Sequence, residues 1–137
     1  LCYKSSSPLN KDECIKIING DIDFLINSEN ELLKEFYCKL KHQCLKPKTI
    51  VDYTREAYIF NAGNVRITID SNIRSGLYSH DLFNSNLTTS GIIDGNPIIL
   101  EIKYDNFLPE IIKDLIQTNT RNQTAVSKYA ACRLLTV

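Results

Sequence analysis

The pattern of apolar and polar residues first predicts two helices near the N-terminus. Residues 10–20 read as a short helix, with Asn10 suited to its N-cap. A longer helix is predicted over residues 29–45, where apolar side chains recur every three to four positions and form an amphipathic stripe. Ser28 and Glu31 have the spacing of a capping box at its start.

Strand-like alternation follows, and it decides the fold class. Residues 48–60 and 64–74 predict two strands of a hairpin, joined by an Asn-Ala-Gly turn, and residues 97–105 predict a third strand. Helical patterns return after Pro109 and over residues 125–135. Such a sequence of elements predicts an α+β fold, with a mostly antiparallel sheet and helices packed on its outside.

The strand at 97–105 has two faces of different character. Successive side chains of a strand point to opposite faces, so one face consists of Ile98, Leu100, Ile102 and Tyr104. The other face consists of Ile99, Glu101, Lys103 and Asp105. We expect the first face to belong to the core. The second is either a solvated surface or the wall of a charged site.

The other strands also carry charge next to apolar residues. With one register slip, the apolar face of 64–74 contains Val65, Ile67, Ile69 and Ile73, and the opposite face contains Asn64, Arg66, Thr68, Asp70, Asn72 and Arg74. Arg55 lies in an otherwise apolar row of 48–60, and Lys128 shares a helix face with small apolar residues. A buried guanidinium needs a partner that offsets its desolvation.

Three interpretations of these charges stay open on pattern alone. They can form the solvated face of an antiparallel sheet. They can form internal salt bridges, such as Arg66 with Asp70 or Glu101 with Lys103. They can also line a closed interior that binds a triphosphate through Arg and Lys, with one carboxylate reserved for Mg²⁺ or Mn²⁺.

Composition narrows the function classes. The 137 residues suit a single domain, and 43% hydrophobic and 23% charged residues are ordinary for a globular chain. With 16 basic and 16 acidic side chains, no global field draws the chain to nucleic acid or to a membrane. No apolar stretch approaches the roughly 20 residues of a membrane span. Five cysteines without metal-ligand spacing are typical of a reducing, cytoplasmic compartment.

Several segments, in this order and spacing, resemble a known family. They are "VRITIDSNIRSG", "ILEIKYDNFLPEIIKDLI" and "SKYAACRLL", together with "YKSSSPLNKDE" and "YTREAYIF". They are similar to the C-terminal part of the VTC domain, the polyphosphate polymerase domain of the vacuolar transporter chaperone group and its bacterial relatives. That family belongs to the triphosphate tunnel metalloenzymes, with a CYTH-like fold whose antiparallel strands close into a tunnel.

The resemblance implies a reaction and a set of residues. The terminal phosphoryl group of a nucleoside triphosphate such as ATP would pass to a growing polyphosphate chain, with Mn²⁺ or Mg²⁺. The residues that the resemblance assigns to phosphate are Arg55, Arg66, Lys103, Lys128, Lys4 and, at the end of its strand, Arg74. Glu101 would be the metal ligand, and Asp70 would pair with an arginine. No protein nucleophile is required.

The chain also departs from the family's pattern. The family's N-terminal strands are absent, and the chain begins at Leu1 without any Met. We therefore interpret residues 1–137 as one domain that is the C-terminal portion of a polymerase domain, and expect it to be inactive alone. Alternatives are a triphosphatase or nucleotide cyclase on the same fold, or a non-catalytic polyphosphate-binding module. Open sheet edges are also compatible with a homo-oligomer.

Overall fold

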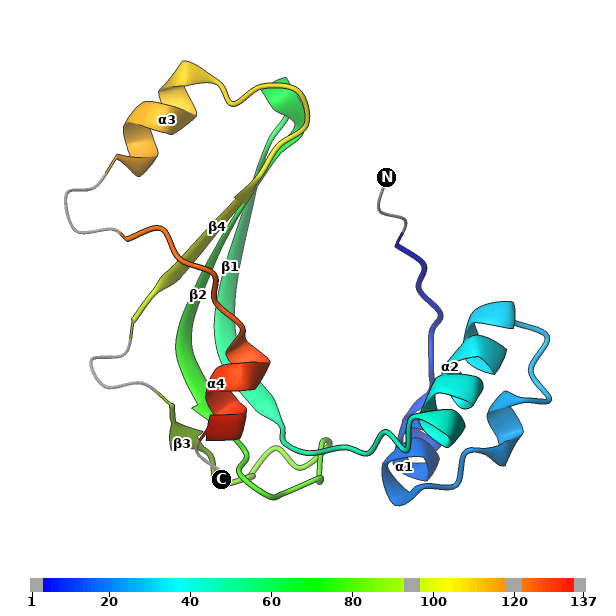
Figure 1. Cartoon of the computed structure of the whole chain (residues 1–137). Helices are drawn as coiled ribbons and strands as arrows, with labels where there is room; N and C mark the ends of the chain where they lie inside the picture. Colours follow the sequence, from blue (N-terminus) through cyan, green and yellow to red (C-terminus); the bar gives the residue numbers. More distant parts are fainter. Residues whose placement is uncertain (1–3, 93–96, 118–121, 135–137) are drawn as a thin grey trace. The chain divides into compact units, whose positions relative to one another are not determined.

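The computed structural model describes residues 4–92, 97–117 and 122–134. The chain divides into two compact units, Leu1–Lys48 and Thr49–Val137 (Figure 1). The first contains helices alone among its described residues, and the second contains an antiparallel sheet with helices. The predicted α+β class is therefore confirmed.

The first helix of the first unit, α1 (Lys11–Asn19), has the predicted N-cap. The Asn10 side chain accepts a hydrogen bond from the Glu13 N–H, and the Glu13 carboxylate accepts one from the Asn10 N–H. These two bonds form a capping box, which satisfies two backbone donors that a helix start leaves free. Gly20, in the left-handed conformation with φ of 86°, ends the helix.

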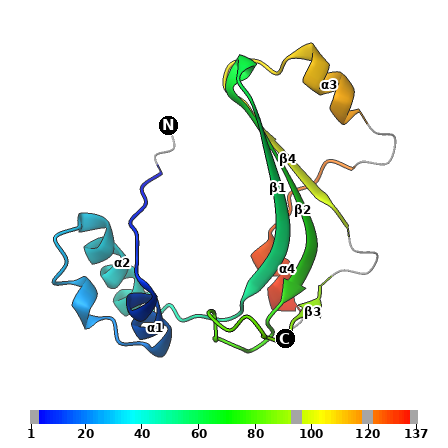
Figure 2. The same ribbon diagram turned by 180° about the vertical axis from the view of Figure 1, so that it is seen from behind.

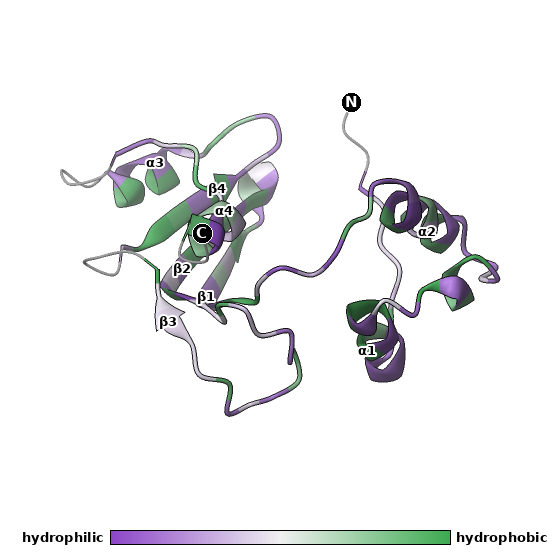
Figure 3. Cartoon of the chain, turned by 60° about the horizontal axis from the view of Figure 1, so that its bottom comes forward, coloured by the Kyte–Doolittle hydropathy of each residue, from purple (hydrophilic) through white to green (hydrophobic). Residues whose placement is uncertain are grey.

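The second helix, α2 (Glu31–His42), begins differently from the prediction. Its N-cap is Asn30, whose side chain accepts a hydrogen bond from the Leu32 N–H. Ser28 instead accepts a hydrogen bond from the Asn30 N–H, so the predicted capping box of Ser28 with Glu31 is wrong. Asn is as good an N-cap as Ser, which is why spacing alone misplaced the start. Hydrophobic and hydrophilic segments alternate along α1 and α2 (Figure 3), as amphipathic helices require.

The sheet of the second unit is organised around one central strand. Strands β1 (Val51–Phe60) and β2 (Val65–Ser75) form the predicted hairpin through a 3₁₀ turn at Ala62–Asn64. Strand β2 also pairs antiparallel with the short β3 (Ser90–Gly91) and with β4 (Ile99–Lys103). The described strands form an open sheet that does not close into a barrel.

A β-bulge divides β2 into two halves. Asp52 of β1 lies opposite Arg74, whereas Thr54 lies opposite Ser71, so β2 holds one extra residue between these pairs. Asn72 within this segment has φ of 51°, a left-handed conformation that Asn tolerates better than most residues. A one-residue bulge exchanges the two faces, so the predicted alternation through Arg74 is wrong beyond Ser71.

Helix α4 (Lys128–Leu134) covers one face of the sheet (Figures 1 and 2). Cys132 on this helix is fully buried and its thiol donates to the Arg74 carbonyl at 3.6 Å. The Ser75 hydroxyl donates to the Cys132 carbonyl at 3.5 Å. These contacts hold the helix at the second half of β2.

The opposite face of the sheet carries the row predicted to be core. Leu100 is 42% exposed and Ile98 is 66% exposed, so the expectation that this row belongs to the core is wrong among the described residues. Helix α3 (Glu110–Ile116), which follows Pro109 as predicted, buries Ile112 but exposes Ile111. Alternation located the two faces correctly, but it did not decide which of them a helix covers.

Candidate functional site

Strand register gathers most of the predicted site residues on one face. Arg55 of β1 lies opposite Asp70 of β2, and Thr68 of β2 lies opposite Glu101 of β4. Helix α4 covers part of the same face and adds Lys128. We call this set the charged face; its members are Arg55, Arg66, Thr68, Asp70, Glu101, Lys103 and Lys128.

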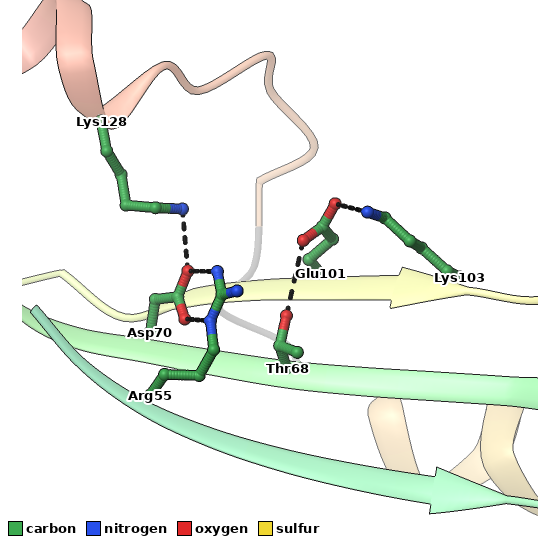
Figure 4. Close-up of polar contacts among 6 residues, drawn as sticks. All are labelled: Arg55, Thr68, Asp70, Glu101, Lys103 and Lys128. Atoms are coloured by element: carbon green, nitrogen blue, oxygen red, sulfur yellow. Dashed lines mark hydrogen bonds and ion pairs between the residues drawn. The ribbon is translucent and has the colours of Figure 1, made fainter. Parts of the chain in front are cut away.

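Asp70 is the centre of one of two side-chain clusters on the charged face. Its side chain is 1% exposed and receives Arg55 in a two-pronged contact, Nε to Oδ1 at 2.6 Å and Nη2 to Oδ2 at 2.7 Å (Figure 4). Lys128 reaches Oδ2 from α4, with Nζ at 2.8 Å. Paired bonds between guanidinium and carboxylate are among the strongest in proteins. One carboxylate thus holds two cations from two elements.

Tyr53 is a further member of this cluster. The Arg55 guanidinium carbon lies 5.1 Å from the Tyr53 ring centroid, and Lys128 Nζ lies 5.2 Å from the same centroid. Cations within about 6 Å of an aromatic face are attracted by its quadrupole. Tyr53 belongs to the otherwise apolar row of 48–60 that contains Arg55, and the sequence pattern assigns it no role. Its position two residues before Arg55 on the same strand face was the available signal.

The contacts between Asp70, Arg55 and Lys128 shift the pKa values of Asp70 and Arg55. The hydrogen bond from Arg55 lowers the pKa of Asp70 from 3.8 to about 2; burial opposes this effect, and Lys128 adds to it. The same hydrogen bond raises the pKa of Arg55 above its ordinary value. Asp70 therefore stays ionised over the physiological range and keeps both cations paired.

Glu101 and Lys103 form the second group on the charged face. Lys103 Nζ lies 3.1 Å from Glu101 Oε1, and the Thr68 hydroxyl lies 3.5 Å from Oε2 (Figure 4). The hydrogen bond from Lys103 lowers the pKa of Glu101. Of the two salt bridges considered from sequence, Glu101 with Lys103 is confirmed, whereas Asp70 pairs with Arg55 and Lys128 instead of Arg66.

The charged face is better suited to a metal ion held jointly by the protein and a phosphate ligand than to one held by protein side chains alone. Within the described ranges, no three His, Cys, Asp or Glu side chains gather in a way that could hold a metal ion. Mg²⁺ commonly takes only one or two carboxylates and completes its shell with phosphate oxygens and water. Glu101, exposed and already ionised, is a suitable ligand of this kind.

Arg66 and Lys103 bring two positive charges to the charged face, which Glu101 balances only in part. They lie directly opposite each other on neighbouring strands, and both side chains are exposed. Like charges in this position destabilise a sheet. Glu101 offsets part of the repulsion through Lys103. An anion bound between Arg66 and Lys103 would offset the rest.

Two predicted residues do not join the charged face. The bulge turns Arg74 to the opposite face from Arg66, and its Nε donates to the Thr89 hydroxyl at 2.6 Å, with Nη2 donating to the Thr89 carbonyl. Arg74 thereby ties the loop before β3 to β2. Lys4 is exposed and belongs to the first unit.

The first unit contains a cavity of different chemistry. It measures about 330 Å³ and lies between residues 5–9 and α2, with Leu9 and Phe36 in its mainly apolar lining. Lys39 also lines it, but its Nζ lies 2.6 Å from Glu35. A triphosphate needs several cations from different directions, so this cavity does not compete with the charged face as a phosphate site.

The fold and the charges on this sheet face together define the class of protein to which the chain belongs. An α+β domain with four cations and two carboxylates on one sheet face is suited to bind polyanions. The chain belongs to the VTC domain family, whose family model matches residues 2–137. No curated protein and no solved structure matches the chain. In the part of the chain that the structure describes, no helix is long and apolar enough to cross a membrane.

Proposed function

We propose that this domain serves a metal-dependent polyphosphate polymerase. The supporting observation is the charged face, where the exposed carboxylate of Glu101 pairs with Lys103 and shares one sheet face with cations of β1, β2 and α4, in a chain of the VTC family. Membership of that family indicates a role related to polyphosphate. The transfer reaction, the nucleotide ATP and the metal are parts of the proposal.

The proposed reaction needs positioning and charge more than a protein nucleophile. A terminal oxygen of the polyphosphate chain attacks the γ-phosphorus of ATP, a new P–O bond forms, and the bond to the β-phosphate oxygen breaks to release ADP. Arg66 and Lys103 would bind non-bridging phosphate oxygens and stabilise their charge in the transition state. Glu101 would hold Mn²⁺ or Mg²⁺, which supplies further neutralisation of phosphate charge when bound.

The proposed reaction needs a site from which water is excluded. Transfer to polyphosphate instead of water requires a site that keeps water out. In the described residues, β1 and β4 each pair on one side alone, so the sheet is open at both edges and does not enclose the charged face. We propose that additional strands close a tunnel over it in the complete domain. The 137-residue chain by itself is expected to bind triphosphate without turning it over.

Substitution of Glu101 tests the proposal. In the full-length protein that carries this domain, Glu101→Gln should lower polyphosphate synthesis from ATP and Mn²⁺ by about 100-fold, because the metal loses an ionised ligand. Glu110→Gln is the matched control, since Glu110 is exposed on α3 and contacts Lys113. It should leave synthesis unchanged. Full synthesis by Glu101→Gln would refute the assignment of the metal ligand.

Product analysis separates the alternatives. Long phosphate chains support the polymerase, free phosphate supports a triphosphatase, and cyclic nucleotide supports a cyclase. Calorimetric binding of tripolyphosphate without any of these products by the complete domain supports a binding module that senses or anchors polyphosphate.

A further inference from the structure

Asp70 has an arrangement that the proposed reaction does not explain. A carboxylate on a phosphate-binding face repels the phosphate ligand. Asp70 nevertheless lies beside Arg55 and Lys128, two of the cations assigned to phosphate binding. Its side chain is 1% exposed, so it is not placed to serve as a solvent-exposed metal ligand as Glu101 is. Removing one partner of any buried ion pair is destabilising, so a contribution to stability does not by itself explain why this pair lies on the charged face. Another role must account for its position.

Asp70 leaves both cations able to bind a further anion. A guanidinium has five N–H donors, and the contacts with Asp70 use one on Nε and one on Nη2 of Arg55. An ammonium has three donors, and Asp70 takes one from Lys128. The side chains of Arg55 and Lys128 are 34% and 22% exposed, so each presents part of its surface to an incoming anion.

Asp70 also removes two costs of binding. Two cations that approach the same anion repel each other when the site is empty, and a shared carboxylate offsets that repulsion. Long side chains lose rotamer freedom when a ligand immobilises them, and contacts made beforehand reduce this loss. Here Asp70 and the Tyr53 ring fix both Arg55 and Lys128.

We propose that Asp70 is a positioning residue that holds Arg55 and Lys128 together as one preformed phosphate clamp, and that it keeps these contacts when the anion binds. This inference rests on the proposed function, since it requires that a polyphosphate anion binds the charged face. The clamp joins β1 and β2 to α4, so it also fixes the helix over the site (Figure 4).

The direction in which Asp70→Asn changes the affinity for tripolyphosphate tests this role. Calorimetry would measure tripolyphosphate binding by the 137-residue chain and by its Asp70→Asn variant. Removing a negative charge beside a polyanion should tighten binding if Asp70 acts by charge alone. Loss of the clamp should instead weaken binding, by about tenfold. Asp52→Asn is the matched control, because it makes the same change on the other face of the sheet, opposite Arg74. It should change the affinity less than twofold.

A second measurement uses the unchanged protein and does not depend on whether Asp70→Asn folds. The Arg55 Nε–H resonance, identified by its loss in Arg55→Lys, should exchange slowly with solvent both without and with saturating tripolyphosphate. Loss of this protection upon binding would mean that the anion displaces Asp70, and would overturn the inference.

The possible outcomes separate the two proposals. If the unchanged chain binds tripolyphosphate but Asp70→Asn binds it equally or more tightly, the positioning role is wrong and the proposed function stands. If the unchanged chain does not bind tripolyphosphate at all, the proposed function and the positioning role both fail. Weaker binding by Asp70→Asn, with protection of Arg55 Nε–H in both states, supports both.

Discussion

At the scale of single residues, Asp70 contrasts with Glu101. Both are carboxylates on the charged face, but Asp70 is buried beneath two cations, whereas Glu101 is exposed and meets Lys103. Their different burial and partners therefore suit the two carboxylates to different roles. Asp70 organises cations, and Glu101 is available to a metal. The sequence singled out both residues, yet it could not say that Asp70 would take Lys128, because that contact joins segments far apart in the chain.

The lowered pKa of Asp70 predicts how stability depends on pH. Its folded value of about 2 lies below the ordinary 3.8, so the unfolded state binds the proton more tightly. The contribution to stability is therefore complete above about pH 3.8 and is lost as the pH falls through about 2. We expect Asp70→Asn to lower the free energy of unfolding at pH 7 by about 2 kcal/mol.

Urea unfolding at a series of pH values checks this expectation. The difference between the unchanged chain and Asp70→Asn should shrink between about pH 4 and pH 2, because the unfolded state of the unchanged chain binds a proton at Asp70 before the folded state does. A difference that stays constant across this range would show that the ion pairs contribute nothing through ionisation. Asp52→Asn again serves as the control, and its difference should be near zero throughout.

At the scale of elements, the turn between β1 and β2 carries the tightest constraint. Gly63 has φ of 77°, and a Cβ placed on it would lie 2.5 Å from the Phe107 carbonyl oxygen. The turn thus packs against the segment that follows β4. The sequence predicted the hairpin and favoured Gly at this turn, but the contact with Phe107 depends on how the third strand docks beside β2.

Gly63→Ala should therefore be more destabilising than the same substitution at a left-handed glycine that has free space around it. We expect a loss of about 3 kcal/mol, from backbone strain of about 1 kcal/mol together with displacement of the Phe107 segment. Gly20→Ala is a matched control, because Gly20 has φ of 86° but nothing within 4 Å of its added Cβ. It should lose only the strain term. Equal losses in thermal or urea unfolding of the two variants would contradict the steric argument.

At the scale of the whole molecule, β2 connects most of what the second unit contains. It pairs with β1, β3 and β4, and its second half lies under α4. Residues 66–70 are flanked by strands on both sides, and this segment carries Arg66, Thr68 and Asp70. The charged face is thus built on the best-supported strand of the sheet, as a site that must hold side chains in place requires.

Hydrogen exchange should reveal this organisation. Amides of β2 between Arg66 and Asp70 should exchange more slowly than those of β4, because β4 is paired on one side alone among the described strands. Mass spectrometry of deuterium uptake by the 137-residue chain measures both segments in one experiment. Exchange in β4 as slow as in β2 would indicate that a further strand or chain covers its free edge.

The sequence by itself determined the α+β class, the hairpin, the faces of the strands apart from the end of β2 beyond Ser71, and the family. These features follow from local periodicity, turn residues and ordered motifs, all of which are properties of short segments. Only the tertiary structure decided that a bulge at Asn72 turns Arg74 away from the charged face, that α4 covers this face, and that Asp70 binds two cations. Register, docking and ion pairing depend on segments distant in the chain, and no local pattern encodes their distances.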